Sequence, residues 1–178
     1  WVPYFLSANH CFSTQSVAST LQTYWFYRSS SCGGPPGSYQ TLTGGATLLY
    51  ATASTDTLFV RLLNSPPSGA YFAGWTAGLP QMDIAVTGVH HPAGDLQKVS
   101  FGNLKGYCVD HNGADCSTTD ASNAKFYKVI WANGVTEGGS SGSGIFNSDA
   151  RLICTLYGGY SSCSSPTSPD YYGRFDIA

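Results

Sequence analysis

Three residues far apart in the sequence, His10, Asp56 and Ser141, carry the side chains that a hydroxyl nucleophile needs. A serine hydroxyl attacks a carbonyl carbon when a neighbouring base takes its proton, and a carboxylate fixes the tautomer of a histidine base. These residue types therefore predict acyl transfer. Ser141 is the expected nucleophile, His10 the general base and then acid, and Asp56 the group that orients the histidine.

Glycines around the serine add a second part of this chemistry. Gly139 and Gly142 flank Ser141 in a run of glycines and serines. Glycine lets the backbone turn tightly, so that successive N–H groups can point into one pocket. We expect the N–H groups of Gly139 and Ser141 to form an oxyanion hole. The order along the chain is His, Asp, Ser, as in chymotrypsin and unlike subtilisin or the α/β-hydrolases.

Each of these signals also has a purely structural interpretation. A single histidine after an apolar run is often a structural or surface residue. A Gly/Ser run is often a flexible loop, and an acid before an apolar strand can be a plain polar boundary residue. The ordered combination of the three is what favours catalysis.

Short strands joined by turns are expected to position these residues. Gly, Pro and Tyr occur 21, 9 and 12 times, whereas good helix formers such as Glu, Met and Lys are rare, so an all-β fold is predicted. One helical turn is expected at 13–18, capped by Ser13. The run 57–63 is almost wholly apolar, which predicts burial on both faces. The predicted strands are 1–6, 21–28, 45–53, 57–63, 71–75, 84–90, 97–104, 126–130, 144–146, 151–157 and 171–177.

The charge balance excludes several kinds of partner. The chain of 178 residues has eight Lys or Arg against ten Asp or Glu, a net charge of -2. This is too little positive charge for nucleic-acid binding by counterion release or for a polybasic membrane contact, and no apolar stretch is long enough to span a bilayer. Six cysteines in a neutral, Ser/Thr-rich chain favour an oxidising, extracellular location.

An ordered series of sequence blocks resembles the chymotrypsin-like serine proteases. The blocks are 5–11 around the histidine, 55–58 around the aspartate and 139–143 around the serine. Within that superfamily the chain is most similar to the bacterial lysyl endopeptidases. The further blocks that it shares with them are 24–27 leading to Cys32, 73–75, 90–92, 134–137, 158–163 and 170–174.

The resemblance implies a chymotrypsin-like double β-barrel with the active site in the cleft between the barrels. Residues 1–64 would form the N-terminal barrel with the catalytic His and Asp. Residues 65–178 would form the C-terminal barrel with the catalytic Ser and the specificity pocket, the two together making one protease domain. The implied protein is a secreted serine endopeptidase that acts on protein or peptide substrates and needs no cofactor and no metal.

The resemblance also implies which residues recognise the P1 side chain, the substrate side chain just before the cleaved bond. Six residues before the serine, where animal trypsins have an acid, the chain has Val135, whereas Asp170 matches the acid of the lysyl endopeptidases. Cleavage after a basic residue, Lys preferred, is therefore implied, because a buried unpaired carboxylate favours a cation. Tyr157, Gly158 and Gly159 would line the substrate backbone.

Alternatives remain open at this pocket. Asp170 can also be read as a solvated loop residue after Pro169, and Glu137 is a second candidate acid. Tyr157 stands where the lysyl endopeptidases have histidine, so the choice between Lys and Arg stays open. Ser140 stands where animal proteases have aspartate, so their zymogen salt bridge is absent.

Compared with that family, the chain lacks the strands that precede the histidine block and a C-terminal helix. We therefore expect a piece of a longer precursor with an incomplete first barrel, whose missing N-terminal segment is a candidate partner. Removing strands from a barrel exposes a new sheet edge. Phe5, Leu21, Trp25 and Leu58 should then be more exposed than core residues usually are.

The six cysteines fit the same expectation. Cys108 and Cys116 flank a short loop and are the best candidates for a disulfide, while Cys154 lies in an apolar strand and should be a buried free thiol. In the related proteases, three cysteines have partners in the missing N-terminal part. Their positions here are Cys11, Cys32 and Cys163.

The same sequence also allows other functions. A catalytically inactive protease-like binding module is the main alternative, and a secreted carbohydrate-binding β domain with an aromatic face is another. Adjacent His90 and His91 suggest a metal, but neighbouring strand residues face opposite sides of a sheet, so no metal site is predicted. Asp110, His111 and Asp115 could hold calcium, although a solvated disulfide loop explains them more simply.

Overall fold

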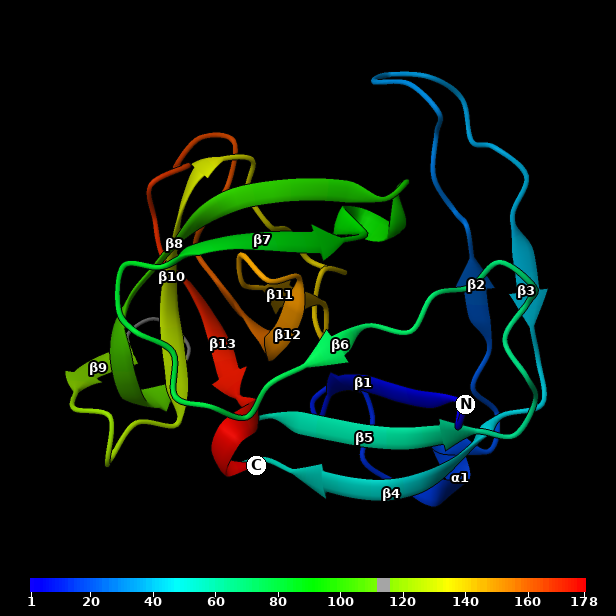
Figure 1. Ribbon diagram of the computed structural model, residues 1–178, viewed down its shortest axis with the longest axis horizontal. Coiled ribbons are helices and arrows are strands. Elements are labelled where there is room, and N and C mark those ends of the chain that lie inside the picture. Colours follow the sequence, from blue (N-terminus) through cyan, green and yellow to red (C-terminus); the bar gives the residue numbers. More distant parts are fainter. Residues whose placement is uncertain (112–115) are drawn as a thin grey trace.

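Strands dominate the chain, as the scarcity of helix-forming residues predicts (Figure 1). The computed structural model describes residues 1–111 and 116–178, without the side chains of 110 and 111. The calcium hypothesis on Asp110, His111 and Asp115 therefore lies outside the described residues. Among the described segments no helix has the length and apolar character needed to cross a membrane. Helical segments are α1 (Gln15–Ala18), η1 (Pro92–Gly94) and η2 (Phe175–Ile177).

Six strands of the C-terminal part close into a barrel. Each pairs antiparallel with the next in the order β10-β13-β12-β11-β7-β8, and β8 pairs back onto β10. The six are β7 (Ala85–His90), β8 (Lys98–His111), β10 (Phe126–Asn133), β11 (Gly144–Phe146), β12 (Arg151–Gly159) and β13 (Asp170–Arg174). Outside the ring, β6 (Gly74–Trp75) pairs with β12 and β9 (Cys116–Thr119) with β8. Leu104, Tyr127, Val129 and Tyr172 fill the interior without measurable exposure.

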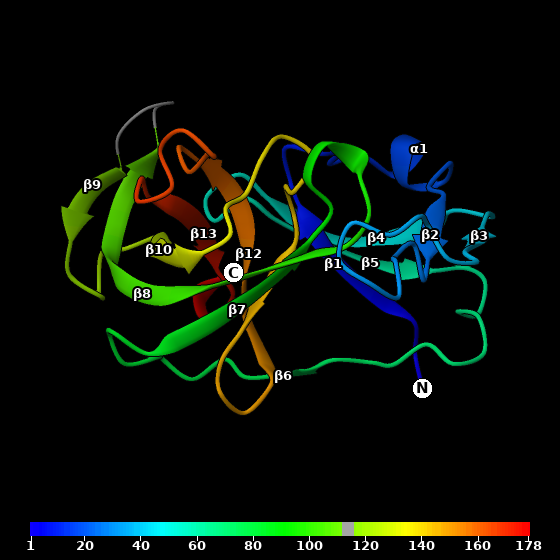
Figure 2. The same cartoon turned by 90° about the horizontal axis from the view of Figure 1, so that it is seen from above.

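The N-terminal strands form an open sheet beside this barrel (Figure 2). The strands β1 (Tyr4–Ala8), β5 (Thr57–Leu62) and β4 (Ala46–Thr52) make an antiparallel sheet in the order β1-β5-β4. The pair β2 (Thr23–Trp25) and β3 (Gln40–Leu42) lies apart from it. Within the described residues no other strand joins β1 or β4, so the first barrel is incomplete, as predicted.

The exposure expected of four core residues is confirmed for three. Phe5, Leu21 and Trp25 are partly exposed, but Leu58 is fully buried. Leu58 lies on β5, the central strand, where both neighbours and the sheet's own core shield it. The expectation that this strand is buried on both faces is wrong as well, because Arg61 points to solvent. Only one face of the open sheet is covered.

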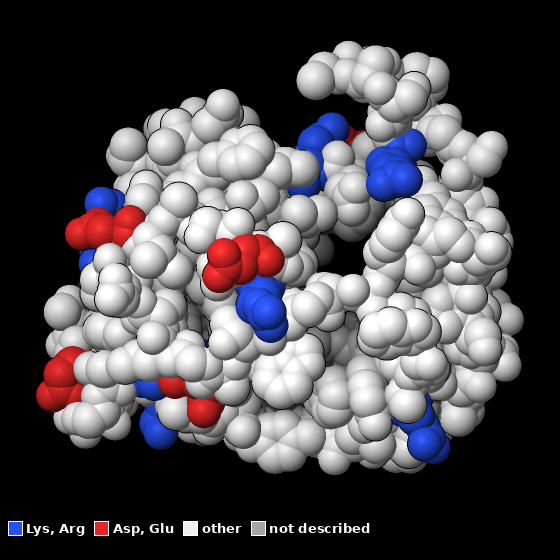
Figure 3. Space-filling model, viewed as in Figure 1, with Lys and Arg blue, Asp and Glu red and all other residues white. Residues whose placement is uncertain are grey.

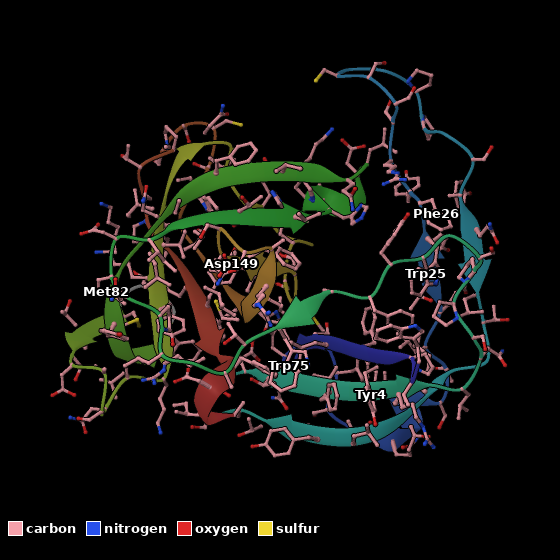
Figure 4. The ribbon with its side chains drawn as sticks, viewed as in Figure 1. Tyr4, Trp25, Phe26, Trp75, Met82 and Asp149 are labelled. Atoms are coloured by element: carbon pink, nitrogen blue, oxygen red, sulfur yellow. A yellow bond between two sulfur atoms is a disulfide. The ribbon has the colours of Figure 1, made fainter. Side chains whose placement is uncertain are left out.

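An apolar groove lies between part of the open sheet and the barrel. Its volume is about 900 Å³, and its walls include Tyr4, Trp25 and Trp75, which Figure 4 shows gathered around it. Trp75 keeps 60% of its surface exposed. Figure 3 shows this hollow in a face on which charged side chains are few and scattered. The groove is a consequence of the open first barrel.

The cysteine predictions are confirmed where the structure tests them. Cys108 and Cys116 form a disulfide between β8 and β9. Cys154 is a free thiol, fully buried in β12, and burial raises its pKa well above the usual value. Three cysteines are free and exposed among the described residues. They are Cys11, Cys32 and Cys163.

Local predictions failed at short polar segments. Thr14, not Ser13, caps α1, because its hydroxyl accepts the Val17 N–H. Strands β3 and β9 were not predicted, since neither has a repeating apolar pattern. The predicted strand 171–177 ends at Arg174 and continues as η2.

Candidate active site

His10 and Asp56 meet because two strands end side by side. Residue 10 follows β1, residue 56 precedes β5, and the antiparallel register pairs Ala8 with Thr57. His10 Nδ1 and Asp56 Oδ2 are 2.7 Å apart. The backbone N–H of His10 also donates to Asp56 Oδ1 at 2.8 Å, and that of Asn9 donates to the Asp56 carbonyl at 2.9 Å. The register of the sheet thus builds this pair.

The carboxylate is buried and the imidazole is accessible. Asp56 is only 4% exposed, whereas the His10 side chain is 41% exposed. Asp56 has a φ of 51°, in the left-handed region, which Asp tolerates better than most residues and which is often found at functional sites. A carboxylate on Nδ1 keeps the ring proton there, so Nε2 is left to act as a base. The edge of the Tyr157 ring lies against the imidazole, with centroids 5.6 Å apart.

Residues 137–143 form two successive tight turns. The Ser140 N–H donates to the Glu137 carbonyl at 2.9 Å, and the Ser143 N–H donates to the Ser140 carbonyl at 3.1 Å. Gly139 has a φ of 93°, which requires glycine. Among the described residues, the N–H groups of Gly139 and Ser141 have no acceptor. Two free donors on either side of Ser140 are what an oxyanion hole requires.

The turn that carries Ser141 packs against the end of β1. Gly142 has a φ of 77°, and a Cβ there would overlap Ser7 Oγ and the backbone nitrogen of Ala8. This contact brings the serine turn next to the segment that leads to His10. No hydrogen bond joins the Ser141 hydroxyl to His10 within the described part of the chain, so this last link remains a prediction. Such bonds are often long before substrate binds.

The hydroxyl of the neighbouring serine, Ser140, is hydrogen-bonded to His90 instead. Ser140 is 1% exposed, and its hydroxyl lies 2.8 Å from His90 Nδ1. On the other side of that ring, His90 Nε2 lies 3.0 Å from the Ser100 hydroxyl. Sequence reasoning missed this cluster. Strand parity could have found His90, because every second residue of β7 faces inward.

Asp170 lies in the interior, so its interpretation as a solvated loop residue is wrong. Its carboxylate is fully buried. Oδ2 accepts from Trp131 Nε1 at 2.6 Å, from Thr136 Oγ1 at 2.7 Å and from Ser161 Oγ at 2.6 Å. Among the described residues, Oδ1 accepts only the Ser161 N–H, at 3.1 Å. No Lys, Arg or His of the described residues forms an ion pair with it. The rival acid Glu137 is exposed.

The other expected substrate contacts lie at the end of β12. Pairing with β11 ends at Thr155, and the pairing with β13 shifts register between Leu156 and Gly158. A side chain at Gly158 would meet nothing within contact distance, whereas one at Gly159 would collide with Asp170. Open space therefore lies beside Gly158, whereas Gly159 packs closely against Asp170.

Similarity to proteins of known family identifies the family of this chain. The family model described as "Lysyl endopeptidase, C-terminal domain" matches residues 1–173. The chain belongs to this family. The lysyl endopeptidase of Pseudomonas aeruginosa is 39% identical over 181 residues, covering 96% of this chain and 37% of that protein. Secreted RxLR effector protein 73 of Plasmopara viticola is 28% identical over 160 residues, covering 86% of this chain and 38% of that protein.

Solved structures share the fold of this lysyl endopeptidase-family chain. The HtrA-type protease AlgW, solved with a decapeptide, matches with a TM-score of 0.61 and 16% identity, over 99% of this chain and 45% of that one. The MamO protease domain of Magnetospirillum magneticum matches with a TM-score of 0.59 and 9% identity, over 99% and 81%. The chain is thus a serine protease-like domain with the chymotrypsin-like fold and an incomplete first barrel.

Proposed function

We propose that this domain is a serine endopeptidase that cleaves protein or peptide chains after a basic residue. The observation that carries the proposal is the Asp56–His10 pair, which lies beside a serine turn with two unpaired backbone donors. Membership of the lysyl endopeptidase family supports the same reaction. The chain spans 37% of the length of the Pseudomonas enzyme.

In the proposed mechanism Ser141 Oγ attacks the scissile carbonyl carbon while His10 Nε2 takes the hydroxyl proton. Asp56 stabilises the resulting imidazolium, and the N–H groups of Gly139 and Ser141 bind the oxyanion. Collapse of the tetrahedral intermediate breaks the C–N bond, and His10 gives its proton to the leaving amine. Water then attacks the acyl-enzyme by the same route. This step releases the acid product and restores the serine hydroxyl.

We propose that Asp170 selects a basic P1 residue. Within the described residues its buried charge has no cationic partner, and its Oδ1 accepts only one hydrogen bond. Tyr157, Gly158 and Gly159 would line the substrate strand, as sheet edges do with extended peptides. Lys is the preferred P1 residue in this proposal because the family match favours it.

The same proposal assigns a role to each half of the chain and a location to the protein. Residues 1–64 would supply His10 and Asp56, and residues 65–178 would supply the serine and the specificity pocket of one protease domain. Secretion is proposed from the disulfide, since structural disulfides persist in oxidising compartments.

A catalytically inactive protease-like binding module is the second candidate. It is favoured by one observation, the absence of a hydrogen bond between Ser141 and His10 in the described structure. Labelling with a serine-directed fluorophosphonate separates the two candidates. We expect stoichiometric labelling of Ser141 that is lost after heat denaturation. An unlabelled folded protein would support the binding module and overturn the endopeptidase proposal.

We further propose that an N-terminal segment of the same precursor covers the apolar groove and the open edges of β1 and β4. Exposed aromatic side chains such as Tyr4 and Trp75 and unpaired strand edges favour such a partner. In a longer precursor chain, hydrogen exchange at the backbone amides of β1 and β4 is expected to be slower than in this chain. Equal exchange rates in the two chains would contradict the proposal.

A further inference from the structure

The imidazole of His90 is hydrogen-bonded, directly or through Ser100, to both ends of the loop 135–140, which leads into the turn with Ser141. His90 Nδ1 lies 2.8 Å from the hydroxyl of Ser140, at the far end of the loop. His90 Nε2 lies 3.0 Å from the Ser100 hydroxyl, which in turn donates to the Val135 carbonyl, at the near end, at 3.1 Å. His90 is 2% exposed. A buried side chain of the barrel thus spans residues 135–140.

The directions of these hydrogen bonds assign the state of the ring. The Ser100 hydroxyl donates its hydrogen to the Val135 carbonyl. It must therefore accept the hydrogen bond from His90 Nε2–H. The Ser140 oxygen already accepts the Glu137 N–H at 3.3 Å, so its own hydrogen can go to Nδ1. Every donor and acceptor of the cluster is then satisfied by a neutral imidazole with its proton on Nε2.

The same strand end touches the serine turn at a second place. The Ala93 N–H, just after β7, donates to the Gly138 carbonyl at 2.7 Å. A Cβ on Gly139 would lie tightly against the backbone nitrogens of Ala93 and Gly94. Ser140 itself separates the two N–H donors of the proposed oxyanion hole. A shift of its side chain would therefore move both donors.

We propose that His90 is a positioning residue that holds the 135–140 loop, and with it the oxyanion hole, only while its imidazole is neutral. The inference rests on the proposed endopeptidase function. When Nδ1 gains a proton it becomes a donor. The buried Ser140 hydroxyl then loses its acceptor, which is costly in the interior, so the turn must rearrange.

The charges around His90 favour the neutral form at ordinary pH. Burial lowers the pKa of His90 below its usual value of 6.5, and nearby His91 lowers it further, while Asp170 and Glu137 oppose the shift. Lys98, opposite on β8, is paired with Asp95. As the pH falls, His90 therefore gains a proton at a higher pH in the unfolded chain than in the folded chain. Stability falls as the pH drops below about 6.5, until the pKa of the folded state is passed.

Three substitutions test the proposal by activity. His90→Leu removes both hydrogen bonds, and kcat should fall about 100-fold with little change in KM, because an oxyanion hole stabilises the transition state. His90→Gln keeps one acceptor and one donor at a similar spacing, so it should recover most of kcat. His91→Gln, at the partly exposed neighbour, is the matched control.

The pH profile distinguishes positioning from bulk stability. In the wild type and in His91→Gln, log kcat/KM should fall more steeply at the acid end than in His90→Gln, because protonation of His90 adds to the loss of activity. In His90→Gln this extra steepness should be absent, because the amide does not titrate. Nitrogen NMR of His90 should report an Nε2–H tautomer above pH 6.5.

Each outcome separates the two proposals. A wild type that neither reacts with fluorophosphonate nor cleaves peptides would overturn the endopeptidase function. An active wild type whose acid slope is unchanged in His90→Gln, or an Nδ1–H tautomer by NMR, would overturn the role of His90 alone. If His90→Leu does not fold, the Gln profile and the NMR assignment decide.

Discussion

Replacing Ser141 with alanine is expected to lower kcat/KM for a peptide substrate by about 10⁴-fold or more, with no loss of folding. The hydroxyl is the only group in the proposed mechanism that forms a bond to the substrate, so nothing replaces it. Ser141 is partly exposed, and its removal leaves no buried group unpaired. Steady-state hydrolysis together with fluorophosphonate labelling measures the effect.

Substitutions of two neighbouring serines are the controls for assigning Ser141 as the nucleophile. Ser140→Ala should keep fluorophosphonate labelling and lose part of kcat, because its hydroxyl binds His90 and not substrate. Ser143→Ala should remain active and at least as stable as the wild type, since Ser143 Oγ is buried without a hydrogen-bond partner among the described residues. Labelling that persists in Ser141→Ala but disappears in Ser140→Ala would show that the nucleophile is Ser140.

The sequence predicted the parts of this site that depend on local pattern. Strand ends and glycine turns have recognisable signals, so the segments that carry His10, Asp56 and Ser141 were placed near their true elements. Their meeting also depends on register. Ala8 pairs with Thr57 across the sheet, which a strand pattern alone does not reveal. The ordered family blocks supplied that missing information.

Features that depend on long-range packing were missed or misjudged. His90 and Ser140 are fifty positions apart, and no local signal links them. Leu58 was expected to be exposed because a barrel lacking strands has open edges, but its strand is the central one of the three that remain. Asp170 was placed by its sequence frame, yet its complete burial under three side-chain donors follows only from the closed barrel.

The loop 135–140 connects the two chemical functions of the site. Near its start Thr136 donates to Asp170 at 2.7 Å, and its N–H donates to Ser161 Oγ at 2.9 Å. At its end Ser140 is held by His90. One short segment is therefore anchored to the proposed specificity acid and to the proposed oxyanion turn. This explains why so many buried polar groups gather under it.

Asp170→Asn is expected to lower kcat/KM for substrates with a P1 Lys by about 10- to 100-fold. An ammonium that reaches the buried Asp170 carboxylate forms a charge-assisted hydrogen bond of about 1.5–3 kcal/mol, which corresponds to that factor. Oδ1 has the acceptor capacity, because the three side-chain donors all lie on Oδ2. Substrates with an apolar P1 residue should lose less than about threefold.

The substitution also disturbs the interior, so a second measurement is needed. In Asp170→Asn the new amide N–H groups can face donors such as Trp131 Nε1, and a lower Tm is expected. The wild-type protein avoids this problem when P1 Lys is compared with P1 norleucine, which has a similar length and no charge. We expect Lys to be preferred by about 10- to 100-fold. Equal rates for the two, or equal losses for basic and apolar P1 in the variant, would make Asp170 a structural residue of the barrel and exclude it from specificity.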